Sequence, residues 1–211
     1  MKKNDLNKLK NSQFLLLSSI GIVLFIALYG LAAWLYPGGS DVDQQATSFS
    51  WRYNYWCELL NPTAQNGQVN EGYIVAFIAT LVLAIAISLS WIGIFPYLPF
   101  KETQRRYFQF SGMLSMIVAL FIFTPLHDFV ILFSGSLSLF TLVALFVGLY
   151  RIKAKRLLWL GCAVLLLMAI NNLIYFTGVG LSYLALLQKF TFIVVLFWVL
   201  LLNRHFMRCD I

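Results

Sequence analysis

Residues 14–36 read FLLLSSIGIVLFIALYGLAAWLY, an apolar stretch without a single charged side chain. A helix rises about 1.5 Å per residue, so about 20 apolar residues cross the hydrocarbon core of a bilayer. The stretch follows a basic start, as in a secretory signal, but it is longer than the roughly 7–15 apolar residues of such a signal. We therefore expect a retained transmembrane helix.

Similar apolar runs recur along the rest of the chain. Together with the first, they predict spans at residues 14–36, 73–95, 108–124, 129–150, 157–176 and 181–202. Gly178 and Gly180 lie between the last two spans and indicate a tight turn. The sequence thus predicts an all-α bundle of six transmembrane helices, one domain over residues 1–211, with one long connection at residues 37–72.

The composition supports lipid as the main solvent of this chain. Apolar residues make up 61% of the sequence and charged residues 11%, whereas soluble domains carry about 25% charged residues. The net charge of +7 is spread over short segments between apolar runs, which is unlike a nucleic-acid-binding patch. We expect membrane lipid as the partner, no nucleic acid, no soluble partner and no cofactor.

The positions of the basic residues predict the orientation. With the N-terminus inside, 13 of the 15 lysines and arginines lie in cytoplasmic segments, Arg52 lies outside and Lys189 lies within a span. Positively charged loops are retained on the cytoplasmic side. We therefore expect both termini in the cytoplasm and residues 37–72 outside.

The predicted outer connection contains an aromatic segment, residues 49–60. If it is helical, Ser50, Asn54, Glu58 and Asn61 share one polar face, and Pro62 ends the helix. One interpretation is an interfacial helix anchored by tryptophans. The other is a lid that turns its polar face toward the bundle, where a buried Glu58 needs a partner. A polar turn at Asn66-Gly67 then leads back to the membrane.

Lys189 is the most informative residue within a predicted span. It follows Leu181 by eight residues, or about 12 Å of helix, and a lysine at the bilayer centre costs about 2.5–3.5 kcal/mol. Its side chain either snorkels to the interface or lines an interior cavity. Gln188 precedes it. Asn171 and Asn172 of the preceding span lie at a depth between the outer surface and Lys189, and asparagines within spans also hydrogen-bond neighbouring helices.

The segment Thr124-Pro125-Leu126-His127-Asp128 joins the third and fourth spans. Asp128 is expected to cap the fourth helix. An imidazole beside a carboxylate also suits general acid–base chemistry, so His127 is a candidate proton carrier.

These polar residues come from separate segments, yet all lie in the predicted outer half, which favours one polar cavity that opens outward. The catalytic candidates are Glu58, His127 and Asp128; the ligand-binding candidates are Lys189, Gln188, Asn171, Asn172, Arg52 and Asn54. A metal held by Glu58, His127 and Asp128 remains an alternative, although the prediction is no metal.

The sequence resembles a family of bacterial six-helix membrane proteins of unknown function, distantly similar to the FRAG/DRAM/Sfk group. The resembling segments are FSWRYNYWCELL (residues 49–60), TPLHDFVI (124–131), NNLIYFT (171–177) and LLQKF (186–190). Cys57-Glu58-Leu59 stands where bacterial relatives often carry Ser-Asp-Leu, which keeps the acid and loses the hydroxyl. The resemblance implies a fold, a topology and a location in the bacterial cytoplasmic (inner) membrane, but no activity.

Three functions remain open at this point. The first is binding of an outer-leaflet lipid or another amphipathic ligand, with Lys189 facing an anionic headgroup. The second is an intramembrane hydrolase or transferase, with Glu58 or His127 as base and Asp128 as its orienting partner. The third is a small transporter, which the lack of an internal repeat disfavours. Whether the protein is an enzyme is left undecided.

Overall fold

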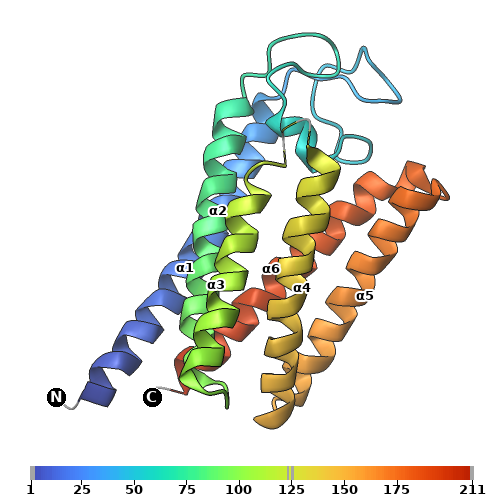
Figure 1. Ribbon diagram of the computed structural model, residues 1–211. Helices are drawn as coiled ribbons and strands as arrows, with labels where there is room; N and C mark the ends of the chain where they lie inside the picture. The colour runs from blue at the N-terminus through green and yellow to red at the C-terminus, as the bar shows by residue number, and fades with distance from the viewer. Residues whose placement is uncertain (1–2, 123, 125, 210–211) are drawn as a thin grey trace. The chain divides into compact units, whose positions relative to one another are not determined.

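The computed structural model describes residues 3–122, 124 and 126–209, apart from the side chains of residues 3–7 and 127. This part of the chain forms six α-helices (Figure 1). They are α1 (Lys3–Leu35), α2 (Tyr73–Ile94), α3 (Glu102–Ala119), α4 (His127–Arg151), α5 (Lys155–Thr177) and α6 (Leu181–Arg208). Two short 3-10 helices, η1 (Trp56–Leu60) and η2 (Phe95–Tyr97), complete the described elements. The all-α prediction is confirmed.

Five of the described helices are long and apolar enough to cross a membrane: α1, α2, α4, α5 and α6. The chain is therefore a multi-pass membrane protein. Helix α3 differs because Glu102, Arg105 and Arg106 lie in its first turns and because it ends at Ala119, before the predicted limit at residue 124. A sixth span at α3 remains a prediction.

The helices extend beyond the apolar runs that predicted them. Helix α1 begins at Lys3 rather than at residue 14, and α6 continues to Arg208 rather than ending at residue 202. Apolarity marks the part of a helix that lies in lipid, whereas lysine and arginine are good helix formers that continue it into the interface. The predicted turn between α5 and α6 is confirmed, with positive φ angles of 74° and 82° at Gly178 and Gly180.

The contacts divide the chain into two compact units. Unit 1 comprises Met1–Val23, Leu81–Gly161 and Phe197–Ile211, and unit 2 comprises Leu24–Thr80 and Cys162–Leu196. Four helices, α1, α2, α5 and α6, contribute a part to each unit.

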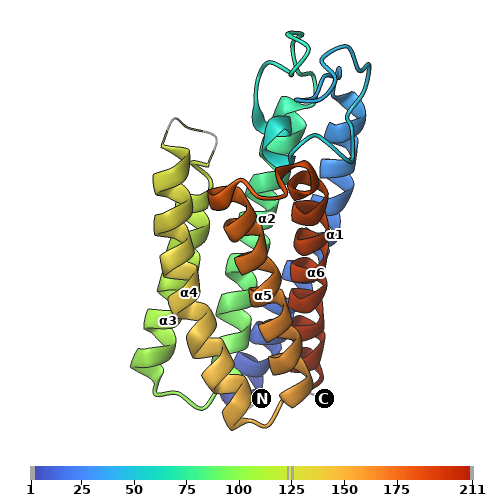
Figure 2. The ribbon, with the colours of Figure 1, turned by 90° about the vertical axis from the view of Figure 1, so that its right-hand side faces the viewer.

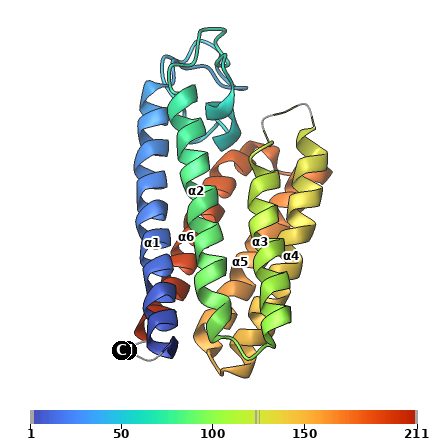
Figure 3. The same ribbon diagram turned by 60° about the vertical axis from the view of Figure 1, so that its left-hand side comes forward.

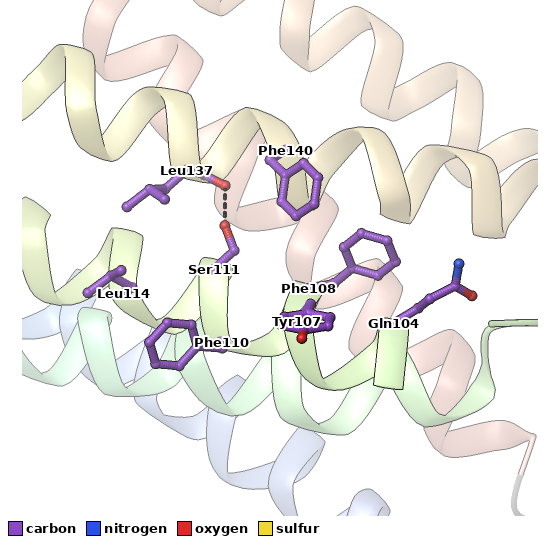
Figure 4. Close-up of a pocket in the computed structure, with 8 residues that line it drawn as sticks. All are labelled: Gln104, Tyr107, Phe108, Phe110, Ser111, Leu114, Leu137 and Phe140. Carbon is purple, nitrogen blue, oxygen red and sulfur yellow. Dashed lines mark hydrogen bonds between the residues drawn. The ribbon is translucent and has the colours of Figure 1, made fainter. Parts of the chain in front are cut away.

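In unit 1, small residues let helices approach closely. A Cβ atom added to Gly21 of α1 would lie 2.8 Å from the Cβ of Ala86 in α2, and the two helices run side by side (Figure 3). Helices α3 and α4 also pack together, and Ser111 Oγ donates a hydrogen bond to the Leu137 carbonyl over 3.0 Å (Figure 4). Small and hydroxyl-bearing residues at interhelical contacts are typical of membrane bundles.

A buried ring of hydrogen bonds joins three helices of unit 1. Ser90 Oγ donates to Asn203 Oδ1 over 3.0 Å, and Asn203 Nδ2 donates to Ser18 Oγ over 3.0 Å. Because the Ser90 proton is already used, Ser18 must be the donor in its 2.6 Å contact with Ser90. We name these three residues the serine–asparagine ring. It carries no charge and its side chains are buried.

In unit 2, the connection between α1 and α2 lies over the ends of both helices (Figure 2). Its own polar groups hold it in place. Asn70 Nδ2 donates to the carbonyls of Leu59 and Asn61 over 3.1 and 2.8 Å, and Asn66 Nδ2 donates to Pro37 over 2.9 Å. The predicted Asn66-Gly67 turn is confirmed by a φ of 80° at Gly67. This connection is therefore a folded cap; we call residues 36–72 the cap.

Candidate functional site

The aromatic segment of the cap does not form the single helix expected for residues 49–60. A turn at residues 51–53 leads instead into the 3-10 helix η1. The cause is Asn54, whose Oδ1 accepts the Ser50 N–H over 2.7 Å and whose Nδ2 donates to the Gly39 carbonyl over 2.7 Å. Asparagine side chains that bond main-chain groups compete with helix formation.

Of the four residues predicted to share one polar face, Ser50 is half-buried and Asn61 is exposed, whereas Asn54 and Glu58 are buried. Their side chains are 0% and 4% exposed. Asn54 Nδ2 donates to Glu58 Oε2, and the Tyr55 N–H donates to Glu58 Oε1 over 3.0 Å. Each carboxylate oxygen thus has a donor, which offsets part of the desolvation of a buried acid.

Lys189 of α6 meets this pair from the helix side. Its ammonium donates to the main-chain carbonyl of Asn54 and, over 3.0 Å, to that of Ala185 one turn earlier. The side chain is 5% exposed, so it does not snorkel into the solvent. We name Asn54, Glu58 and Lys189 the lysine cluster; all three belong to unit 2.

The charges in the lysine cluster are close but not in contact. In the described part of the chain, no carboxylate oxygen lies within 4.0 Å of the Lys189 ammonium. Asn54 connects the two charges. Its main-chain carbonyl accepts a hydrogen bond from Lys189, and its side-chain amide donates a hydrogen bond to Glu58. Phe49 also contributes, because the ammonium lies 5.5 Å from the centroid of its ring in a cation–π arrangement.

Burial alters the acidity of the cap residues. It raises the pKa of Glu58, although the hydrogen bonds from Tyr55 and Asn54 oppose this shift. Burial raises the pKa of the neighbouring Cys57 thiol too, with a further contribution from Glu58. A thiol with a raised pKa stays protonated near neutral pH and is a poor nucleophile. Cys57 is therefore a poor candidate for a catalytic nucleophile.

Aromatic rings of α1 and α6 pack against Trp56, which lies between Asn54 and Glu58 in the chain. Tyr29 of α1 donates from its hydroxyl to the Trp56 carbonyl over 3.1 Å, and the two rings are 4.7 Å apart. Phe192 of α6 lies 6.0 Å from the Trp56 ring. Gln188 Oε1 accepts the Trp56 N–H over a long 3.5 Å. These contacts hold Trp56, and with it the η1 segment, against α1 and α6.

Not all of the predicted residues join this cluster. Asn171 of α5 donates to Thr191 Oγ1 over 2.7 Å. Thr191 is two residues beyond Lys189, which places it about 200° around the helix, so Asn171 meets a different face of α6. Asn172 is exposed and bonds the Met168 carbonyl of its own helix. Arg52 is exposed and lies over the Tyr53 ring.

The segment at residues 124–128, which was predicted to join the third and fourth spans, belongs to unit 1. Asp128 is exposed in the first turn of α4, where its charge suits the helix dipole. The expected N-cap at Asp128 is wrong, because α4 already begins at His127 and Leu126 occupies that position. The side chain of His127 lies outside the described residues.

Within the described residues, no three histidine, cysteine, aspartate or glutamate side chains come together as metal ligands. The metal alternative of Glu58, His127 and Asp128 stays untested, since it depends on the His127 side chain.

Several residues of the site carried no clear signal in the sequence. Asn70 fastens the cap but has the sequence context of an ordinary loop residue. Phe49 contacts Lys189 and Tyr29 contacts Trp56, yet aromatic residues near the end of a span are common. Only the four-residue spacing of Asn54 and Glu58 within an aromatic segment indicated that these two side chains lie on one face.

The geometry defines the class of this protein: an all-α, multi-pass membrane protein with a folded cap that covers a buried lysine. Comparison with protein-family models, with curated proteins and with solved structures finds no match for the chain. The resemblance to the bacterial six-helix family therefore stays a prediction.

Proposed function

We propose that this protein binds an amphipathic ligand with an anionic headgroup, an outer-leaflet lipid in particular, and that residues 36–72 act as a lid over the binding site. In this proposal the chain crosses the bacterial inner membrane six times, with both termini in the cytoplasm. The observation that carries the proposal is the buried Lys189 ammonium, which is held by main-chain carbonyls and not by a contacting acid among the described residues.

A buried ammonium is expensive unless an anion or several dipoles stabilise it. Here one of the two carbonyls belongs to Ala185 of the same helix and is permanent, whereas the other belongs to Asn54 of the cap. Only the second partner leaves when the cap opens. A phosphate or carboxylate could then take its place and form a charge-assisted hydrogen bond, about twice as strong as a neutral one.

A second polar group in the same unit supports ligand binding. The indole N–H of Trp56 is buried and has no acceptor among the described residues. An unsatisfied buried donor costs about 1–3 kcal/mol. A ligand oxygen beneath the cap would satisfy it, close to the Gln188 contact of the same residue.

Exposed aromatic residues of unit 2 support a site near a headgroup layer. Trp34 and Trp51 are 79% and 54% exposed, and Tyr183 at the start of α6 is 64% exposed. Tryptophan and tyrosine prefer the membrane–water interface. A headgroup in that layer would need to move only a short distance to reach Lys189, about 12 Å along α6 from Leu181.

The experiment is native mass spectrometry of the full chain, purified in mild detergent, followed by analysis of the retained lipids. Wild type should retain anionic lipid over zwitterionic lipid. Lys189→Met keeps the length and apolar stem but removes the charge, and should lower anionic retention about tenfold or more, as expected for a hydrogen bond to a charged group.

Glu58→Gln provides the opposite change. It keeps the Lys189 charge and removes the nearby competing carboxylate, so anionic retention should rise. If the lysine cluster has only a structural role, the two variants should not change anionic retention in opposite directions. If both variants retain the same lipids as wild type, Lys189 is only an anchor for the cap and the proposed function is wrong.

A further inference from the structure

A strongly basic hollow lies in unit 1, apart from the lysine cluster. It has a volume of about 660 Å³ and is lined by residues of the α4–α5 turn and of the last turns of α6. Its lining residues are Lys153, Ala154, Lys155, Arg156, Leu157, Leu201, Arg204, His205 and Arg208. Five are permanent cations and none is acidic. All belong to unit 1.

These cations form no ion pair with an acidic side chain in the described part of the chain. Within the described residues, the only ion pair is between Arg106 and Glu102, so none of the five lining cations is neutralised by a described acid. The five side chains are exposed. Helix α5 begins at Lys155, so the positive end of its dipole adds to the field in the hollow.

The backbone of the turn gives an independent observation. The Ala154 N–H donates to the Leu149 carbonyl over 2.9 Å and the Lys153 N–H to Tyr150 over 3.1 Å, as in a Schellman ending of α4. The residue at the left-handed position of this motif is usually glycine. Here it is Lys153, with a φ of 61° and the only positive φ among the described non-glycine residues. Strained conformations of this kind cluster at ligand sites.

The geometry points to a binding site for a phosphate-bearing anion in this hollow. The ligand chemistry is that of a phosphate or phosphodiester, because lysines and arginines on several sides of one concavity can each donate to its oxygens. Leu157 and Leu201 form part of the lining and would face the first carbons of an acyl chain. An anionic phospholipid headgroup and free phosphate are the two sources of this chemistry. The site does not depend on the proposed function of the lysine cluster.

The test measures thermal unfolding and native mass spectra of the full chain in nonionic detergent, with phosphatidylglycerol, phosphatidylcholine or inorganic phosphate added. Arg204→Gln and Arg208→Gln should each weaken phosphatidylglycerol binding about fivefold, the effect of one cation at a membrane surface. Arg106→Gln is the matched control, because it removes the same charge from the same unit outside the hollow. It should leave binding unchanged.

Lys153→Gly separates binding from folding. Glycine adopts the left-handed conformation without strain, so this variant should unfold at an equal or higher temperature and yet bind phosphatidylglycerol more weakly. Stabilisation by inorganic phosphate alone would identify a free-phosphate site, and stabilisation only by phosphatidylglycerol would identify a headgroup site. If Arg106→Gln weakens binding as much as Arg204→Gln, the attraction is diffuse and the site does not exist.

Discussion

The serine–asparagine ring of unit 1 and the lysine cluster of unit 2 are both buried and hydrogen-bonded, but they differ in charge and in closure. In the ring, three uncharged side chains from three helices satisfy one another. In the lysine cluster, an acid and a base are separated by Asn54, and one of the segments involved is a connection between helices. Because the three neutral side chains of the ring already hydrogen-bond one another, a ligand would not stabilise it further. In the proposed function a ligand stabilises the lysine cluster, because the Asn54 carbonyl that binds Lys189 belongs to the proposed lid.

The largest expected effect follows from removal of the Lys189 charge. Lys189→Met leaves Glu58 buried without a nearby cation, and we expect a loss of about 3 kcal/mol, at the lower end of the range for broken buried ion pairs. Thermal unfolding in detergent, followed by tryptophan fluorescence, measures it. The double variant Glu58→Gln/Lys189→Met should recover part of the loss. Additive effects would show that the two charges do not interact.

The ring should respond to a single substitution less strongly. Asn203→Leu leaves Ser18 and Ser90 with unmatched hydroxyl groups, and we expect a loss of about 1–3 kcal/mol. The triple variant Ser18→Ala/Ser90→Ala/Asn203→Leu removes every partner at once and should unfold close to wild type, because replacing all members of a network with apolar groups can be nearly neutral. A triple variant as unstable as Asn203→Leu would mean that the ring holds the helices by more than mutual satisfaction.

The distinction between the clusters had only partial support in the sequence. Six helices, the α5–α6 turn and the Asn66-Gly67 turn follow from apolar runs and glycine positions, which are local signals. Lys189 stands out by sequence alone, because it is a charge inside an apolar run. That Asn54 would stand between Lys189 and Glu58 could not be predicted, because it depends on a side chain that interrupts the expected helix. The ring was also missed, since Ser18 and Ser90 carry no charge and Asn203 lies just beyond the predicted end of the last span at residue 202.

The pH dependence of folding stability is a smaller difference between the two clusters. The folded state raises the pKa of Glu58 above its ordinary value of 4.5, mainly by burial, with Asp41 adding to the shift and Lys189 opposing it. The folded cap therefore binds a proton more readily than the unfolded chain in the window above pH 4.5. Stability from this group is complete below that pH and is lost as the pH rises through the folded pKa.

Measured unfolding should accordingly show a decrease in stability from mildly acidic toward neutral pH. Glu58→Gln should flatten this part of the profile, whereas Asn203→Leu should shift the whole profile down without changing its slope. A wild-type profile that rises with pH in this window would mean that the hydrogen bonds from Tyr55 and Asn54 outweigh burial.

The smallest expected change is in the reactivity of Cys57, and it tests both the cap and the proposed topology. Cys57 is half-buried and its thiol pKa is raised, whereas Cys209 is exposed. In chains that carry one of these cysteines alone, a membrane-impermeant maleimide on intact cells should label Cys57 slowly and Cys209 only after permeabilisation. Lys189→Met should speed the labelling of Cys57 severalfold, because it removes the bond from α6 to the Asn54 carbonyl. Asn203→Leu, which weakens the other cluster, should leave the rate unchanged. Equal acceleration by both variants would show that the cap responds to general loss of stability, and the lysine cluster would then not be the latch that holds it.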